Sequence, residues 1–166
     1  VAVVFDDLFF VDDWNIDDVE KAFSPFYGRW NKNEFQSYLN KFNLNRKKKI
    51  KECSKGMKLK LSLAVALSHQ ARLLILDEPT SGLDPVARDE LLDILLEYIE
   101  DENNSILFST HITSDLDKIA DYLTIIDNGK VFYTGLKDEL FEKYCIIKGG
   151  VEDLTPDLEK RLIGLQ

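Results

Sequence analysis

The sequence predicts an α/β fold built around a largely parallel sheet. Three short, mainly apolar stretches, residues 1–5, 73–76 and 105–109, alternate with longer segments in which apolar residues recur at helical spacing. The valine-rich run at residues 1–5 is typical of a strand that is buried on both faces, as in parallel sheets. Parallel sheets place their ligand sites at the carboxyl ends of the strands, so the chemistry of this protein is expected there.

The first half of the chain is expected to be mainly helical. Residues 15–44 have a helical pattern that Pro25 and Gly28 interrupt, and residues 54–70 predict one long helix with Ser54 as its N-cap. Core packing explains the aromatic residues of the first segment better than base stacking does, because they are widely spaced: Phe23, Phe26, Tyr27, Trp30, Phe35, Tyr38 and Phe42.

The second half begins with a clear helix start. Asp84 and Pro85 fit the N-cap and the first position of a helix that continues to about residue 100. A helix is also expected over residues 112–121. Residues 122–127 and 130–134 predict a hairpin around Asn128-Gly129, a pair that favours a two-residue turn. Residues 136–166 are interpreted as a mostly helical, amphipathic tail.

Composition indicates a single globular domain rather than a membrane span or a disordered segment. The 166 residues are 45% hydrophobic and 31% charged. The longest uncharged run near the middle, residues 61–71, is shorter than the ~20 apolar residues of a membrane-spanning helix. Cys53 and Cys145 are far apart and match no metal-ligand spacing, so both are interpreted as reduced thiols.

Positive charge is concentrated in one window of an otherwise acidic chain. The net charge is −9, yet residues 41–60 contain nine basic residues and one acid. A solvated loop or helix end is the preferred interpretation, and a basic collar around an anionic ligand or partner is the main alternative. A nucleic-acid patch is least favoured, because the rest of the chain would repel a polyanion. We therefore expect no nucleic-acid partner.

Two adjacent carboxylates follow the second predicted strand. Asp77 and Glu78 come directly after residues 73–76, where buried charge is costly unless a cation or a reacting water uses it. In a nucleotide hydrolase the first carboxylate would hold Mg²⁺, and the second would orient or polarise the attacking water. The alternative is a strand end at which both carboxylates are simply solvated.

The residues around this pair resemble one family. Residues 73–85, Leu-Leu-Ile-Leu-Asp-Glu-Pro-Thr-Ser-Gly-Leu-Asp-Pro, are similar to the Walker B and D-loop segment of ABC-type ATPases. Four further segments match the family's motifs in the same order along the chain. They are residues 4–7 for the Q-loop region, 54–58 for the signature loop, 108–111 for the switch histidine, and 126–131 for the strand pair that follows it.

The resemblance implies a P-loop NTPase (RecA-like) fold and a division of the chain. The parallel sheet core, here partial, would comprise residues 1–11 and 71–135. An inserted α-helical subdomain that carries the signature loop would comprise residues 12–70, and residues 136–166 would form a C-terminal helical tail.

The resemblance also implies roles for individual residues around ATP and Mg²⁺. Asp77 would be the Mg²⁺ ligand, Glu78 the catalytic base, and His111 a contact to the γ-phosphate and the attacking water. Asp6 stands where the family has a glutamine, and as a carboxylate it could bind Mg²⁺ or a water but could donate no hydrogen bond.

A second group of residues would serve the ATP held by a partner subunit. Ser54, Lys55 and Gly56 lie at a helix start, where free N–H groups and the helix dipole favour an anion such as the γ-phosphate. Asp84 would lie at the interface between subunits. The helix-cap interpretations of Ser54 and Asp84 are compatible with these roles.

Two departures from the family pattern affect these expectations. The signature reads Cys53-Ser54-Lys55-Gly56-Met57 instead of Leu-Ser-Gly-Gly-Gln, a form seen in some exporter-type branches. A phosphate-binding loop of the pattern Gly-x₄-Gly-Lys-Ser/Thr does not occur in these residues, and Gly129-Lys130 belongs to the hairpin instead. The chain is therefore expected to correspond to a nucleotide-binding domain without its N-terminal part.

The function expected from the resemblance is that of the ATP-hydrolysing subunit of an ABC transporter. Its partners would be a second nucleotide-binding subunit, with which it dimerises, and a membrane-spanning subunit docked near residues 15–44. It would be cytoplasmic and peripheral at the inner face of the cell membrane, and this chain alone would be inactive. The alternatives are a soluble ABC-type ATPase acting on DNA or the ribosome, and a non-catalytic regulatory module of the same fold. The sequence does not reveal the transported substrate or the direction of transport.

Overall fold

The structure is a computed structural model that describes residues 1–5, 10–144, 150 and 155. The chain divides into two compact units, Val1–Ile119 and Ala120–Gln166, and each is described by itself. Among the described residues, the helices include none that combines the length and the apolar character needed to cross a bilayer.

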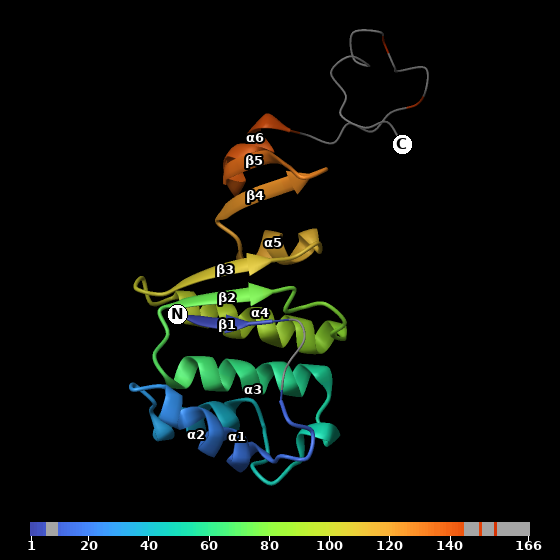
Figure 1. Cartoon of the computed structure of the whole chain (residues 1–166). Coiled ribbons are helices and arrows are strands. Elements are labelled where there is room, and N and C mark those ends of the chain that lie inside the picture. Colours follow the sequence, from blue (N-terminus) through green and yellow to red (C-terminus); the bar gives the residue numbers. More distant parts are fainter. Residues whose placement is uncertain (6–9, 145–149, 151–154, 156–166) are drawn as a thin grey trace. The chain divides into compact units, whose positions relative to one another are not determined.

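The first unit contains a parallel sheet and the helices that pack on it (Figure 1). In chain order its elements are β1 (Ala2–Val4), α1 (Ile16–Phe23), the 3₁₀ helix η1 (Ser24–Phe26), α2 (Lys32–Lys41), the 3₁₀ helix η2 (Ile50–Glu52), α3 (Lys55–Ser68), β2 (Leu73–Asp77), α4 (Pro85–Ile99), β3 (Ser105–Ser109) and α5 (Thr113–Ile119). This alternation of strands and helices confirms the α/β class predicted from the sequence.

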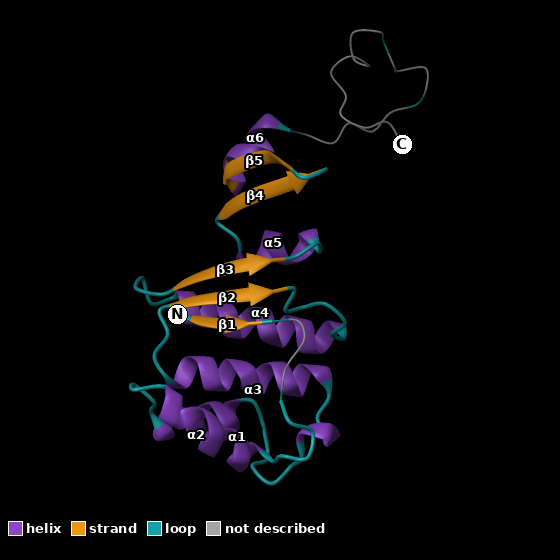
Figure 2. Ribbon diagram, viewed as in Figure 1, coloured by secondary structure: helices purple, strands orange, loops and turns teal. Residues whose placement is uncertain are grey.

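The three strands lie in the order β1-β2-β3, and both pairs are parallel. Figure 2 shows the three arrows pointing the same way. Val3 is paired with Ile75, and Ile75 with Leu107, so the register is continuous across the sheet. The last pair is Asp77 with Ser109, which brings the carboxyl ends of β2 and β3 to one edge.

Only one face of this sheet is covered in the described structure. Leu74 and Leu76 are almost completely buried, whereas Val3 and Leu107, on the other face, are 46% and 62% exposed. The expectation that residues 1–5 form a strand buried on both faces is therefore wrong for this chain. The apolar run is continuous, but α3 packs against β1 and α4 against β3 to cover only one face.

Helix α3 is the central element of the core. Leu61, Leu63 and Ala64 are completely buried, and α3 contacts β1, α1, α2 and α4. Because it is surrounded by other elements, most of its length is apolar on all sides, as expected for an interior helix. The predicted helix over residues 54–70, with Ser54 as N-cap, is confirmed to within two residues at its end.

The aromatic segment at residues 15–44 forms three short elements, α1, η1 and α2, as the predicted interruption at Pro25 and Gly28 implies. Asn15 caps α1 in a reciprocal capping box with Asp18, and Asn31 caps α2. Phe35 and Phe42 are buried, which confirms the core interpretation for them. Phe26 is 85% exposed, so that interpretation is wrong for this residue.

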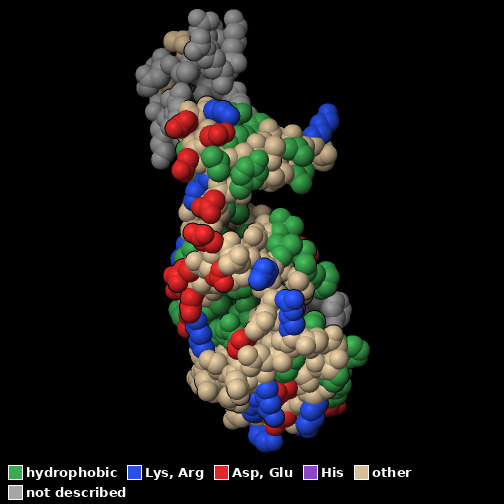
Figure 3. Space-filling model, turned by 90° about the vertical axis from the view of Figure 1, so that its left-hand side faces the viewer, with side chains coloured by type: hydrophobic (Ala, Val, Ile, Leu, Met, Phe, Trp, Pro, Cys, Tyr) green, Lys and Arg blue, Asp and Glu red, His purple; other side chains and the backbone are tan. Residues whose placement is uncertain are grey.

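Acidic side chains from other elements neutralise much of the basic window at residues 41–60. Arg46 and Lys47 both pair with Asp17 of α1, and Lys51 pairs with Asp13 at 2.8 Å. Figure 3 shows Lys and Arg side chains beside Asp and Glu side chains at the lower end of the view. These pairs support the solvated-surface interpretation over a site for an anionic partner.

The second unit is built on an antiparallel hairpin. Strands β4 (Tyr122–Asp127) and β5 (Lys130–Leu136) are joined by Asn128 and Gly129, whose φ angles of +47° and +73° suit the predicted two-residue turn. Helix α6 (Lys137–Lys143) follows, so the start of the predicted tail is helical. Cys145 and nearly all of the remaining tail lie outside the described residues.

A buried histidine at the end of α3 predicts acid sensitivity. His69 is 8% exposed and stacks on Tyr27 with ring centroids 4.1 Å apart, and its Nε2 has no hydrogen-bond partner among the described residues. Burial lowers the pKa of the ring below its usual 6.5. The folded chain therefore binds this proton less readily than the unfolded chain, and the free energy of unfolding falls as the pH drops below about 6.5.

Urea unfolding of the chain at about pH 7.5 and about pH 5 checks this prediction. The loss of stability between the two conditions should be smaller in His69→Phe than in the wild type. Equal losses in His69→Phe and wild type would contradict the assignment.

Candidate functional site

The two adjacent carboxylates lie where the carboxyl ends of β2 and β3 meet. Asp77 is the last residue of β2, and Glu78 follows with a left-handed backbone, φ +47°. The Glu78 N–H donates to the backbone oxygen of Ser109 and lies the same 3.1 Å from its Oγ. The strand therefore ends at Asp77, and Glu78 no longer follows its alternation of side chains.

Ser109 links the carboxylate of Asp77 to the backbone of Glu78. Its Oγ donates to Asp77 Oδ1 at 2.7 Å and accepts from the Glu78 N–H. From the sequence, Ser109 was expected only as part of the switch segment at residues 108–111, with no role of its own. The register of β3 against β2 would have identified Ser109, because Ser109 ends β3 and is paired with Asp77 at the end of β2.

His111 lies beside Glu78. Its Nδ1 is 2.8 Å from Glu78 Oε2, and the two side chains are 71% and 30% exposed. The structure therefore brings Asp77, Glu78 and His111 together at one open edge of the sheet, as the resemblance implied. A carboxylate hydrogen-bonded to an imidazole and open to solvent has the geometry needed to orient a water and to exchange protons with it.

The second predicted group gathers at the N-terminal ends of α3 and α4. A side chain added at Gly56 would be 3.5 Å from the Ala87 side chain and 3.6 Å from that of Leu83, so the start of α3 packs closely on the start of α4. Lys55 Nζ is 3.6 Å from the point where a side chain on Gly82 would begin. The signature and D-loop segments of this one chain are therefore neighbours.

Both cap interpretations in this group are confirmed. Ser54 Oγ accepts a hydrogen bond from the Met57 N–H at 3.2 Å. Asp84 Oδ1 accepts from the N–H groups of Val86 and Ala87 at 3.1 and 3.0 Å. These bonds order the two helix starts and leave both residues exposed.

The carboxylate of Asp77 is a suitable Mg²⁺ ligand. In the described part of the chain no group of three or more His, Cys, Asp or Glu side chains is arranged to hold a metal. Mg²⁺ beside a nucleotide usually takes only one or two carboxylates, because phosphate and water oxygens complete its shell. Asp77 is exposed and Ser109 binds one of its oxygens, so the donor set fits this mode. Asp6, the second predicted ligand, lies outside the described residues.

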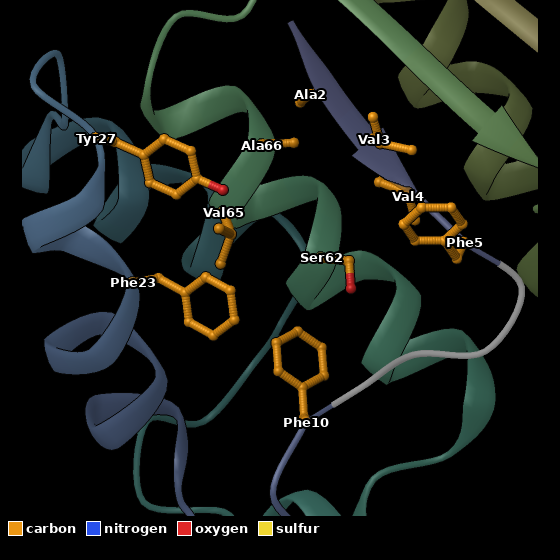
Figure 4. Close-up of a pocket in the computed structure, with 10 residues that line it drawn as sticks. All are labelled: Ala2, Val3, Val4, Phe5, Phe10, Phe23, Tyr27, Ser62, Val65 and Ala66. Atoms are coloured by element: carbon orange, nitrogen blue, oxygen red, sulfur yellow. The ribbon is translucent and has the colours of Figure 1, made fainter.

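A separate pocket lies between β1, α1 and α3 (Figure 4). Its volume is about 170 Å³, and Phe10, Phe23, Tyr27 and Val65 are among the residues that line it. Among the described residues that line it there is no carboxylate, histidine or lysine, so they offer neither a metal ligand nor a cation for a phosphate. It is therefore distinct from the carboxylate site.

Comparison with known proteins gave consistent findings. The family model described as "AAA domain, putative AbiEii toxin, Type IV TA system" matches residues 5–116. The lantibiotic transport ATP-binding protein SrtF of Streptococcus pyogenes is 38% identical over 118 residues, which cover 66% of this chain and 51% of SrtF. The uncharacterized ABC transporter ATP-binding protein YxlF of Bacillus subtilis is 43% identical over 93 residues, covering 56% of this chain and 31% of YxlF.

Similarity to solved structures extends over more of the chain. An ATP binding subunit of an ABC transporter matches with a TM-score of 0.71 and 26% identity, covering 85% of this chain and 61% of that one. The chain spans about half the length of SrtF, and less of YxlF.

Proposed function

Because this chain belongs to the AAA-domain family and is an ABC-type ATP-binding segment, we propose that its protein hydrolyses ATP to ADP and phosphate to drive transport across a membrane. The observation that carries the proposal is the meeting of Asp77, Glu78 and His111 at one edge of the sheet. A strand end with merely solvated carboxylates would not need Ser109 to hold Asp77 or an imidazole to pair with Glu78.

Glu78 is the proposed general base. Its Oε2 is hydrogen-bonded to His111 Nδ1, and its other oxygen is available to accept a proton from the attacking water. His111 would orient this carboxylate and contact the γ-phosphate. Asp77 would hold Mg²⁺, which neutralises developing charge on the phosphate oxygens when it is bound. This division of labour favours hydrolysis over the non-catalytic alternative.

The starts of α3 and α4 are the proposed contact to the ATP of a second subunit. Ser54, Lys55 and Gly56 would present N–H groups and a positive charge to the γ-phosphate at a helix N-terminus. Asp84 would lie at the interface of the dimer. The close packing of Gly56 on Leu83 and Ala87 supports a shared role, because movement of one helix start would displace the other.

The proposed membrane partner docks on the aromatic helical segment at residues 15–44. Phe26, whose large apolar side chain is 85% exposed, would be one of the contacts to this partner. The protein would then act at the inner, cytoplasmic face of the cell membrane.

Mg²⁺-dependent ATP turnover by the full-length protein tests the proposed function. We expect turnover that requires Mg²⁺, and we expect Ser109→Ala to raise the Mg²⁺ concentration for half-maximal turnover roughly tenfold, because the Asp77 carboxylate loses the group that orients it. Residues 1–166 alone are expected to show no turnover.

Ser105→Ala is the matched control. Ser105 begins the same strand that Ser109 ends and is also exposed, but it lies at the opposite edge of the sheet. It should leave the Mg²⁺ dependence unchanged. Absence of ATP turnover from the full-length protein would contradict the proposal, as would equal effects of the two serine substitutions.

A further inference from the structure

A buried carboxylate lies near the site and has no part in the mechanism proposed above. Asp115 of α5 is completely buried, and it lies four residues after His111. A buried carboxylate is costly unless charged and hydrogen-bonding partners compensate for the lost water. The partners of Asp115 therefore indicate what the group is for.

Both oxygens of Asp115 are used. Oδ2 accepts a hydrogen bond from Thr80 Oγ1 at 2.6 Å, and Oδ1 accepts one from Arg88 Nε at 2.6 Å. Arg88 also donates to Ser114 Oγ, next to Asp115 on α5. Thr80 is itself 1% exposed, so its hydroxyl bond to Asp115 is shielded from water. Bonds to a charged acceptor in such surroundings are strong and geometrically specific.

Through Thr80 and Arg88, Asp115 connects the segment that carries Glu78 to the segment that carries His111. Thr80 lies two residues after Glu78, in the loop that leads to α4, and Arg88 lies in the first turn of α4. The same loop is folded back by the Ser81 N–H, which donates to the Glu78 carbonyl at 3.0 Å. Asp115 thus joins the loop after Glu78 to the helix after His111.

We propose that Asp115, through Thr80 and Arg88, is a positioning group that holds His111 beside Glu78, an inference that rests on the proposed function. The His111 side chain is 71% exposed, so packing around the ring does little to fix its place. Its position depends on how the backbone of residues 109–115 is held against the loop after Glu78. The buried bond between Thr80 and Asp115 makes this connection directly.

Thr80→Val in the full-length protein tests the proposal, because valine keeps the shape of threonine and has a methyl group in place of the hydroxyl. The turnover number should fall roughly tenfold or more, since small displacements of catalytic groups are costly. The KM for ATP should change less than the turnover number, because Thr80, Arg88 and Asp115 are not themselves assigned to nucleotide binding. Thr80→Ser, which restores the hydroxyl, should recover most of the turnover.

Lys118→Gln is the matched control. Lys118 also joins α5 to α4, through Asp89 and Asp93, but it does not bond the loop after Glu78, so its replacement should leave turnover unchanged. Hydrogen exchange of residues 109–115 provides a readout that does not need activity. Thr80→Val should accelerate exchange there, and Lys118→Gln should not.

The outcomes separate the two proposals. Unchanged turnover and exchange in Thr80→Val would overturn the positioning role, and so would a loss of turnover that Thr80→Ser does not restore. If the wild type lacks ATP turnover, the proposed function fails, and the exchange comparison still decides whether Thr80 holds the two segments together.

Discussion

Replacing Glu78 by Gln is expected to lower ATP turnover by the full-length protein roughly 100- to 10,000-fold, the range that general acid–base catalysis contributes. Glutamine keeps the size of the side chain and can still bond His111, but its amide cannot accept a proton from water at neutral pH. Nucleotide affinity should stay close to that of the wild type, because the loss concerns a group used in the reaction and not in binding. Steady-state turnover and direct nucleotide titration measure the two effects separately.

Glu100→Gln is the matched control for this experiment. Glu100 is an exposed glutamate at the end of α4, remote from the strand ends, and its replacement should leave turnover within experimental error of the wild type. Turnover by Glu78→Gln at the wild-type rate would show that Glu78 is not the base. A parallel loss of nucleotide binding would show instead that the carboxylate acts mainly in binding.

Replacing Leu74 by Ala is expected to lower the free energy of unfolding by about 2–5 kcal/mol, the usual cost of truncating a buried leucine. Leu74 is completely buried in the middle strand β2, on the face of the sheet that the helices cover. The cavity left behind would border the core of the first unit, where the surrounding elements can relax only partly. Urea denaturation of the 166-residue chain measures the change.

Leu107→Ala tests whether the loss of stability in Leu74→Ala comes from the burial of Leu74 or only from its position in the sheet. Leu107 lies in the neighbouring strand but is 62% exposed on the other face, so the same substitution should change the stability of the chain by about 0.5 kcal/mol or less. A loss at Leu107 as large as that at Leu74 would contradict one-sided burial of this sheet.

Features that depend on a few neighbouring residues were predictable from the sequence. Ser54 at the start of α3 and Asp84 before Pro85 at the start of α4 are confirmed as N-caps. The turn at Asn128 and Gly129 has the positive φ angles that this residue pair favours. In each case the energy comes from hydrogen bonds or backbone preferences within one turn of chain, so no knowledge of distant contacts is needed.

The candidate site was predictable in part. Asp77, Glu78 and His111 could be assigned to one edge because parallel strands end at the same edge. The bridging role of Ser109 depends on the register of β3 against β2, which adjacent residues do not determine. Asp115 is one of many acidic residues in a chain with 30 of them, and nothing in its neighbourhood indicates complete burial.

The sequence by itself determined most of the elements and their caps, because these follow from local hydrogen bonding and from the spacing of apolar residues, and the order of the motifs followed from the resemblance to ABC-type ATPases. Only the tertiary structure decided which face of the sheet is buried, that His111 contacts Glu78, and that Thr80 and Arg88 enclose Asp115. Those outcomes depend on contacts between segments about 30 residues apart, and such contacts are selected by packing and by the pairing of buried charge.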